Sequence, residues 1–129
     1  MATTPSFAAT PRISAGRATT LETSLSAPTG AVAVFAAAAG GSRIHRIDII
    51  ALATTTAGMV NLFWYDGANY RLWKSVAVTA ITVPAGGPPF QIALLFPEGL
   101  PVPGTGFATL YAATYTGDDF DVVAYGGDL

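Results

Sequence analysis

The chain is 129 residues long, the size of one domain that buries about two-thirds of its unfolded surface. It contains no cysteine, so disulfides, thiolate metal ligands and thiol nucleophiles are excluded. A net charge of -2 at pH 7 with a single lysine gives no general attraction to nucleic acid, and no apolar stretch reaches the roughly 18 residues of a membrane helix. We therefore expect neither nucleic acid nor a membrane as a partner.

The surface is expected to be poor in charge. Charged residues make up 11% of the chain and apolar residues 51%, whereas about a quarter of an average protein is charged. Such a surface exposes neutral or apolar patches, which commonly mark contacts with other protein chains. Basic residues concentrate in the first third of the sequence and acidic residues near its end. Opposite signs at the two ends suit head-to-tail contacts; the alternative is a set of solvated loop charges that contribute little.

Residues 1–30 are predicted to form an extended N-terminal arm. They are rich in threonine, serine, alanine and proline, and they hold too few large apolar residues to cover a core face. The large apolar residues are spaced as single anchors along a neighbouring subunit or along the protein's own body. The candidate interface residues in this segment are Phe7, Arg12, Ile13, Arg17 and Leu21.

Residues 31–129 are predicted to form an all-β domain. Short apolar runs recur about every ten residues, turns rich in glycine and proline separate them, and no segment has a helical period. We expect an antiparallel two-sheet sandwich of jelly-roll type, with an immunoglobulin-like strand order as the alternative. Strands are predicted over residues 31–35, 43–53, 59–65, 70–78, 90–96, 107–115 and 120–125.

The strand predicted over residues 43–53 contains an irregularity. Ile47 and Ile49 share one face of a regular strand, whereas Ile44 falls on the other face. This switch of parity predicts either burial on both faces or a bulge near His45.

Turns are predicted from glycine and proline at three places. An Asp66-Gly67 pair between two alternating runs is a strong hairpin signal, because glycine tolerates the positive φ of tight turns. Prolines in residues 84–89 lack the donor that a ladder needs, so this segment is predicted to be a loop. Residues 97–106 are predicted to form a long turn for the same reason.

No residue pattern predicts catalysis, a metal or a cofactor. His45 is the only histidine, and the nearby Ser42 lacks the strained glycine-flanked turn of a nucleophilic serine. Asp118, Asp119 and Asp121 resemble a calcium-binding group only weakly, because the spacing of a calcium loop is missing, and a solvated turn is favoured. We therefore expect no enzymatic activity and no bound cofactor.

Aromatic residues gather at one predicted hairpin. Trp64, Tyr65, Tyr70 and Trp73 flank the turn, with Arg71 among them. Such clusters bind sugars or stack on bases, but each ring also buries on the order of 150 to 250 Å² that a small sandwich needs for its core and interfaces. We expect core or interface roles, and the candidate interface residues here are Trp64, Arg71 and Trp73.

Four segments carry a resemblance to a known class of proteins. They are Gly41-Ser42-Arg43-Ile44-His45-Arg46-Ile47, Leu62-Phe63-Trp64-Tyr65-Asp66-Gly67, Tyr70-Arg71-Leu72 and Ala124-Tyr125-Gly126-Gly127-Asp128. Through these segments, over roughly residues 30–129, the chain resembles small virion proteins encoded by tailed bacteriophages. The resemblance implies a β-sandwich on the outside of the particle, as in head decoration or cement proteins, head fibres and tail-associated proteins. It implies no catalytic residues.

From the resemblance and the low charge we expect a capsid decoration protein. It would bind and stabilise the lattice of the major capsid protein through its arm and sandwich, and it would pair with itself, a homotrimer being favoured. Its expected place is the outer surface of the phage head, after assembly in the host cytoplasm. The alternative is a head fibre or a tail or baseplate protein that contacts host surface glycans.

Overall fold

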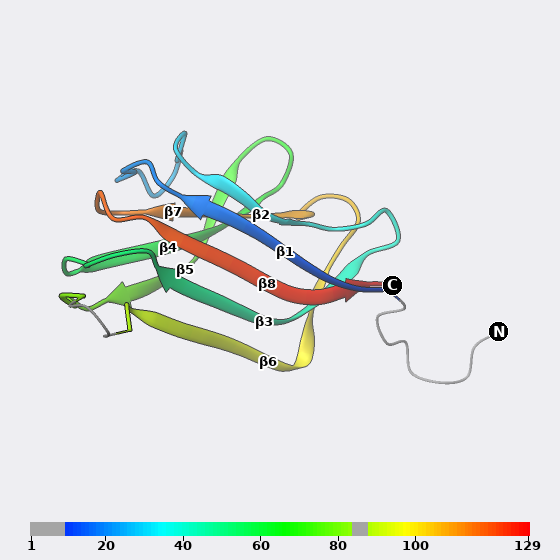
Figure 1. The fold of residues 1–129 in the computed structure, drawn as a ribbon. Helices are drawn as coiled ribbons and strands as arrows, with labels where there is room; N and C mark the ends of the chain where they lie inside the picture. The colour runs from blue at the N-terminus through cyan, green and yellow to red at the C-terminus, as the bar shows by residue number, and fades with distance from the viewer. Residues whose placement is uncertain (1–9, 84–87) are drawn as a thin grey trace.

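Two four-stranded antiparallel sheets form a sandwich in the computed structural model, which describes residues 10–83 and 88–129 (Figure 1). No helix occurs in these two ranges. The predicted all-β, two-sheet sandwich is therefore confirmed. The strands are β1 (Thr10–Ala18), β2 (Val32–Ala36), β3 (Ser42–Ala51), β4 (Gly58–Tyr65), β5 (Tyr70–Val78), β6 (Gln91–Val102), β7 (Thr109–Thr114) and β8 (Phe120–Asp128).

The strands are paired in a nested order. One sheet has the order β1-β8-β3-β6 and the other has β2-β7-β4-β5. Because β1 pairs with β8, β2 with β7, β3 with β6 and β4 with β5, the chain doubles back as one long antiparallel ribbon that alternates between the sheets. We interpret this nesting as a jelly-roll arrangement. The immunoglobulin-like alternative is wrong, because that order places the first strand beside the second.

The prediction that residues 1–30 form an extended arm is wrong for β1. Residues 10–18 pair with β8 along their whole length, from Thr10 opposite Asp128 to Ala18 opposite Phe120. Residues 10–18 are therefore part of the sandwich, and the boundary predicted at residue 30 is wrong for this segment. Residues 1–9, which include the predicted anchor Phe7, lie outside the described residues.

The hydrophobic core lies between the two sheets. Every strand of both sheets except β1 and β6 contributes several buried side chains to it, and the rings of Phe90 and Phe120 meet edge to face with their centroids 6.4 Å apart. The largest fully buried apolar side chains include Phe35, Ile44, Ile47, Ile49, Leu62, Leu110 and Phe120.

β3 contains the predicted bulge. Its register with both β6 and β8 shifts between Ile44 and Arg46, so that His45 is an extra residue in the ladder. The shift lets Ile44 and Ile47 both point into the core, where each is 0% exposed. Of the two explanations for the change of parity, the bulge is therefore confirmed.

The turn predicted over residues 97–106 is wrong for its first part, which belongs to β6. The strand continues to Val102, and residues 96–99 form a wide bulge opposite the single extra residue His45. Gly99 in this bulge has a φ of 78°, which suits glycine. β6 is an edge strand with a partner on one side only, so the missing N–H groups of its prolines cost few hydrogen bonds between strands. The proline and glycine signals therefore marked an irregular edge strand.

Candidate functional site

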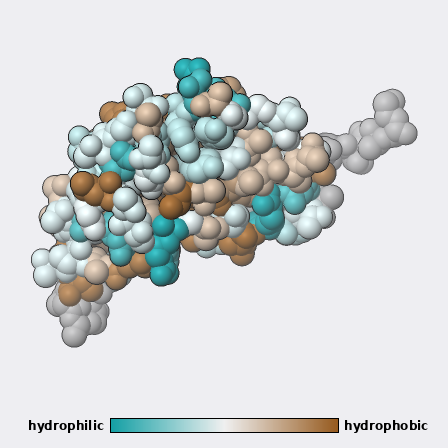
Figure 2. Space-filling model, turned by 90° about the horizontal axis from the view of Figure 1, so that it is seen from above, coloured by the Kyte–Doolittle hydropathy of each residue, from teal (hydrophilic) through white to brown (hydrophobic). Residues whose placement is uncertain are grey.

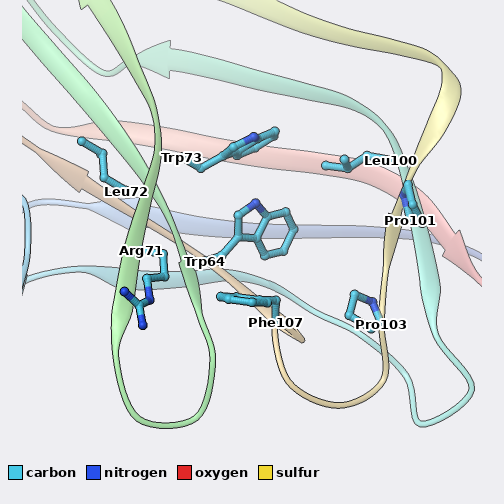
Figure 3. Close-up of a pocket in the computed structure, with 8 residues that line it drawn as sticks. All are labelled: Trp64, Arg71, Leu72, Trp73, Leu100, Pro101, Pro103 and Phe107. Atoms are coloured by element: carbon cyan, nitrogen blue, oxygen red, sulfur yellow. The ribbon is translucent and has the colours of Figure 1, made fainter.

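A groove lined by aromatic side chains lies where the free edges of β5 and β6 meet (Figure 3). Its volume is about 360 Å³. Residues from β4, β5, β6 and the loop that precedes β7 converge on it. We call it the aromatic groove, and its lining residues are Trp64, Arg71, Leu72, Trp73, Leu100, Pro101, Pro103 and Phe107.

Trp73 is placed in the groove by a second bulge. The register between β4 and β5 shifts between Leu62 and Phe63, which makes Trp73 the extra residue on β5. Its ring lies 5.4 Å from that of Trp64, with an angle of 49° between the ring planes. Its ring also stacks on that of Phe96 of β6, with centroids 5.8 Å apart and an angle of 24°. These contacts join the edges of the two sheets and hold both indole rings in place.

One ion pair lies at the rim of the groove. Arg71 Nε is 3.6 Å from Asp66 Oδ2, and the Arg71 side chain is 63% exposed. Asp66 Oδ1 accepts hydrogen bonds from the backbone N–H groups of Asn69 and Ala68, at 2.7 and 2.9 Å. These two bonds, and then the charge of Arg71, lower the pKa of Asp66. The rim therefore offers paired hydrogen-bond donors and acceptors with no net charge.

Three of the predicted interface residues, Trp64, Arg71 and Trp73, are thus brought together in one groove. Four residues predicted from the N-terminal segment are described, and they lie elsewhere: Arg12, Ile13 and Arg17 on β1, and Leu21 just after it. Leu21 is 56% exposed and forms an isolated bridge with Thr114 of β7. The eight candidates therefore do not form a single surface.

Arg12 is occupied by contacts within the protein. Its Nη2 donates hydrogen bonds to the carbonyl of Ala36 at 2.7 Å and to Asp128 Oδ1 at 2.9 Å. Its guanidinium also lies over the ring of Phe35, 4.1 Å from the centroid. Arg12 therefore links the two sheets at the end of the sandwich, and its guanidinium is used in contacts within the protein.

Ile13 and Arg17 lie on the solvent side of the β1-β8-β3-β6 sheet, which we call the outer face. The register places Ile13 level with Tyr125, Arg46 and Leu95 across all four strands. Because core residues alternate with these positions, their side chains point away from the core. The outer face comprises Ile13, Ala15, Arg17, Arg46, Asp48, Ile50, Gln91, Ala93, Leu95, Asp121, Val123 and Tyr125.

The outer face combines exposed aliphatic side chains with charges that are paired within the face. Ile13 is 67% exposed and Leu95 is 65% exposed. Arg17 Nε is 2.7 Å from Asp121 Oδ1, and Arg46 Nε is 2.6 Å from Asp48 Oδ1. Within the face as defined, each charge therefore has a partner on the same face.

A cluster of tyrosines, missed at the sequence level, lies on the solvent side of the other sheet. Tyr65, Tyr70 and Tyr111 come from β4, β5 and β7, with centroids 4.7 to 5.7 Å apart. Phe63 contacts Tyr70 and is fully buried although it lies outside the main core. Burial, and then Tyr111 and Tyr65, raise the pKa of Tyr70. The sequence offered Tyr65 and Tyr70 at one hairpin, but only the strand order adds Tyr111.

The acidic residues near the end of the chain serve separate structural contacts. Asp118 Oδ2 accepts hydrogen bonds from the backbone N–H and the hydroxyl of Thr56, at 2.8 and 3.1 Å, and Asp121 pairs with Arg17. His45 is exposed at its bulge. Within residues 10–83 and 88–129, no three histidine, aspartate or glutamate side chains are placed to hold a metal ion. The same two ranges contain no helix able to cross a membrane.

No protein-family model, curated protein or solved structure matches the chain. What the protein binds must therefore be inferred from the aromatic groove and the outer face.

Proposed function

We propose that this chain is a virion structural protein of a tailed bacteriophage, namely a capsid decoration (cement) protein that acts by burying surface against other protein chains. The observation that carries the proposal is the outer face, where exposed aliphatic side chains surround charges that are already paired. The resemblance in four strand and turn segments supports the phage assignment.

The paired charges favour contact with another protein. An unpaired charge would need a counter-charge on the partner or would lose hydration when covered. Arg17 and Arg46 keep their carboxylate partners when another surface covers them, so the cost of covering them is reduced. Complete burial of an exposed aliphatic side chain contributes about 1.5 to 3 kcal/mol, which applies to Ile13 and Leu95. On the side that Figure 2 shows, strongly hydrophilic residues form separate patches among neutral and hydrophobic ones.

The size of the outer face favours repeated attachment over a single strong contact. Four strands about 4.8 Å apart, each contributing a stretch of about five residues, cover roughly 320 Å². A stable interface buries about 800 Å² on each partner, so one such face binds weakly. Weak contacts become stable when several copies are linked or when the partner is a regular lattice. A homotrimer on the lattice of the major capsid protein, on the outside of the head, meets both conditions.

The test replaces exposed aliphatic residues of the outer face by aspartate. Ile13→Asp and Leu95→Asp place an unpaired charge in the proposed contact and should reduce occupancy on undecorated phage heads about tenfold or more. Leu25→Asp is the matched control, because Leu25 is also exposed, at 41%, but lies outside the outer face. Undiminished occupancy by folded Ile13→Asp and Leu95→Asp proteins would remove the decoration role.

A head fibre or a tail or baseplate protein that contacts host glycans is the second candidate. The aromatic groove favours it, because half-buried indole rings that line a groove beside paired polar groups suit sugars. Imaging the position of the subunit on the particle separates the two candidates. A subunit distributed over the capsid lattice supports decoration, and a subunit confined to fibres or the tail supports glycan contact.

A further inference from the structure

We propose that the aromatic groove binds a neutral saccharide, with a sugar ring against the indoles of Trp64 and Trp73 and its hydroxyls bonded to Arg71 and Asp66. This inference rests on the second proposed function, and it narrows glycan contact to one groove and one class of sugar.

The aromatic part of the groove is held in place before any ligand arrives. Trp73 is stacked on Phe96 and also contacts Trp64, so neither indole has to be ordered on binding. In the view of Figure 3, the Trp64 ring lies between those of Trp73 and Phe107. The C–H face of a sugar ring is flat and weakly apolar, and it packs on such rings with little entropic cost.

The polar part of the groove matches the hydroxyls of a sugar. The Arg71 guanidinium offers several N–H donors in a plane, and the Asp66 carboxylate, which its backbone bonds keep ionised, offers acceptors. A hydroxyl donates and accepts at once, so adjacent hydroxyls can engage both groups. A ligand without hydrogen-bonding groups would leave both groups unused, and a polyproline peptide, which has carbonyl acceptors but no N–H donors, would leave the Asp66 carboxylate without a donor.

The charge balance of the groove selects a neutral sugar. Among the described residues that line the groove, Arg71 alone is charged, and Asp66 Oδ2 lies 3.6 Å from its Nε. A carboxylated or sulfated sugar would gain attraction to Arg71 and meet repulsion from Asp66. The volume of about 360 Å³ is near the small end of ligand sites and suits a short oligosaccharide.

Tryptophan fluorescence of the full chain can measure binding in this groove directly. The chain has two tryptophans, and both line the groove. Titration with neutral hexasaccharides of glucose, galactose, mannose and N-acetylglucosamine should give a saturable change in emission with at least one of them. Oligogalacturonate tests the exclusion of acidic sugars, and decaproline tests a polypeptide as the occupant.

Two variants that keep both tryptophans test the residues involved. Arg71→Ala removes hydrogen bonds from a charged donor and should weaken binding of that sugar about tenfold. Phe107→Ala removes a ring from the wall of the groove and should also weaken it. Arg46→Ala is the matched control, because it breaks another arginine–aspartate contact, which lies on a different surface, and should leave the affinity unchanged.

The inference is overturned if no neutral hexasaccharide changes the emission, if oligogalacturonate or decaproline binds more tightly, or if both groove variants bind like the unchanged protein. A glycan array probed with the same protein separates this failure from that of the proposed function. Binding on the array that Arg71→Ala and Phe107→Ala do not affect moves the site away from the groove and keeps glycan contact. No binding on the array removes both.

Discussion

Arg12 on β1 and Asp128 on β8 are 116 residues apart in the sequence, yet Arg12 Nη2 lies 2.9 Å from Asp128 Oδ1. The same carboxylate oxygen accepts a hydrogen bond from Ser42 of β3 at 2.7 Å. Arg12 also reaches the carbonyl of Ala36 in the opposite sheet. One side chain therefore links the first strand, the last strand and the second sheet.

Replacing Arg12 by alanine should reduce the free energy of unfolding by about 1 to 3 kcal/mol, because charged hydrogen bonds and the contact with Phe35 are lost together. Denaturant unfolding measures the loss. Arg17→Ala is the control on the same strand, because its contact with Asp121 is exposed and its removal should leave the midpoint nearly unchanged. Equal losses in the two variants would contradict a linking role for Arg12.

Asp128 should make the protein less stable in acid. The Ser42 hydroxyl, and then Arg12, lower the pKa of Asp128 below its ordinary value of 3.8. A carboxyl whose pKa is lower in the folded state stabilises the fold above its unfolded pKa, and this contribution is lost as the pH falls through the folded pKa. The difference in melting temperature between the unchanged protein and Asp128→Asn should therefore be largest near neutral pH and disappear in strong acid.

Ser42→Ala provides a check on the cause of that effect, because it removes the largest contributor to the pKa of Asp128 and keeps the carboxyl itself. Its melting temperature should depend less on pH below about 4 than that of the unchanged protein. An identical dependence on pH in Ser42→Ala would assign the acid sensitivity to other carboxyls.

Gly126 should not tolerate a side chain. A Cβ atom at this position of β8 would overlap the backbone carbonyl oxygen of Arg43 on β3. Because two backbones cannot both move without breaking the ladder, Gly126→Ala should strongly lower the yield of folded protein and its melting temperature. Gly117→Ala is the matched control: nothing lies within 4 Å of its added Cβ, so stability should be unchanged or slightly raised.

Tyr70 should ionise at a higher pH than a free tyrosine side chain. Burial and its neighbours Tyr111 and Tyr65 raise its pKa above 10.0. A raised pKa means that its contribution to stability is complete below the unfolded pKa and is lost as the pH rises through the folded pKa. Phenolate absorbance during an alkaline titration should show a late step that Tyr70→Phe removes and that Tyr125→Phe retains. A late step that persists in Tyr70→Phe would contradict the assignment.

Alternation of apolar and polar residues was sufficient to predict the β-sandwich. It also offered a bulge near His45 as one of two explanations for the parity of Ile44 and Ile47, and the structure contains that bulge. β1 was missed because its burial is slight: Ala18 is its one fully buried residue, and Ile13 points to solvent. An edge strand with small residues leaves no strong pattern, so its pairing with β8 depends on the rest of the sheet.

The aromatic groove was predictable in part. Trp64, Arg71 and Trp73 lie on one hairpin, so local sequence was enough to group them. The opposite wall, with Leu100 and Phe107, comes from a separate edge strand and loop. Which edges meet depends on the order of strands in two sheets, and the local pattern of each strand carries no information about that order.

The pairing of β1 with β8 constrains when the protein can fold during its synthesis. Ribosomes add about 5 to 20 residues per second, so the nascent β1 waits on the order of ten seconds before β8 exists. Closing so long a loop is also slow, because the chain loses conformational entropy before the contacts between β1 and β8 can stabilise it. While β1 is unpaired during synthesis, its composition of small and polar residues gives it little tendency to aggregate.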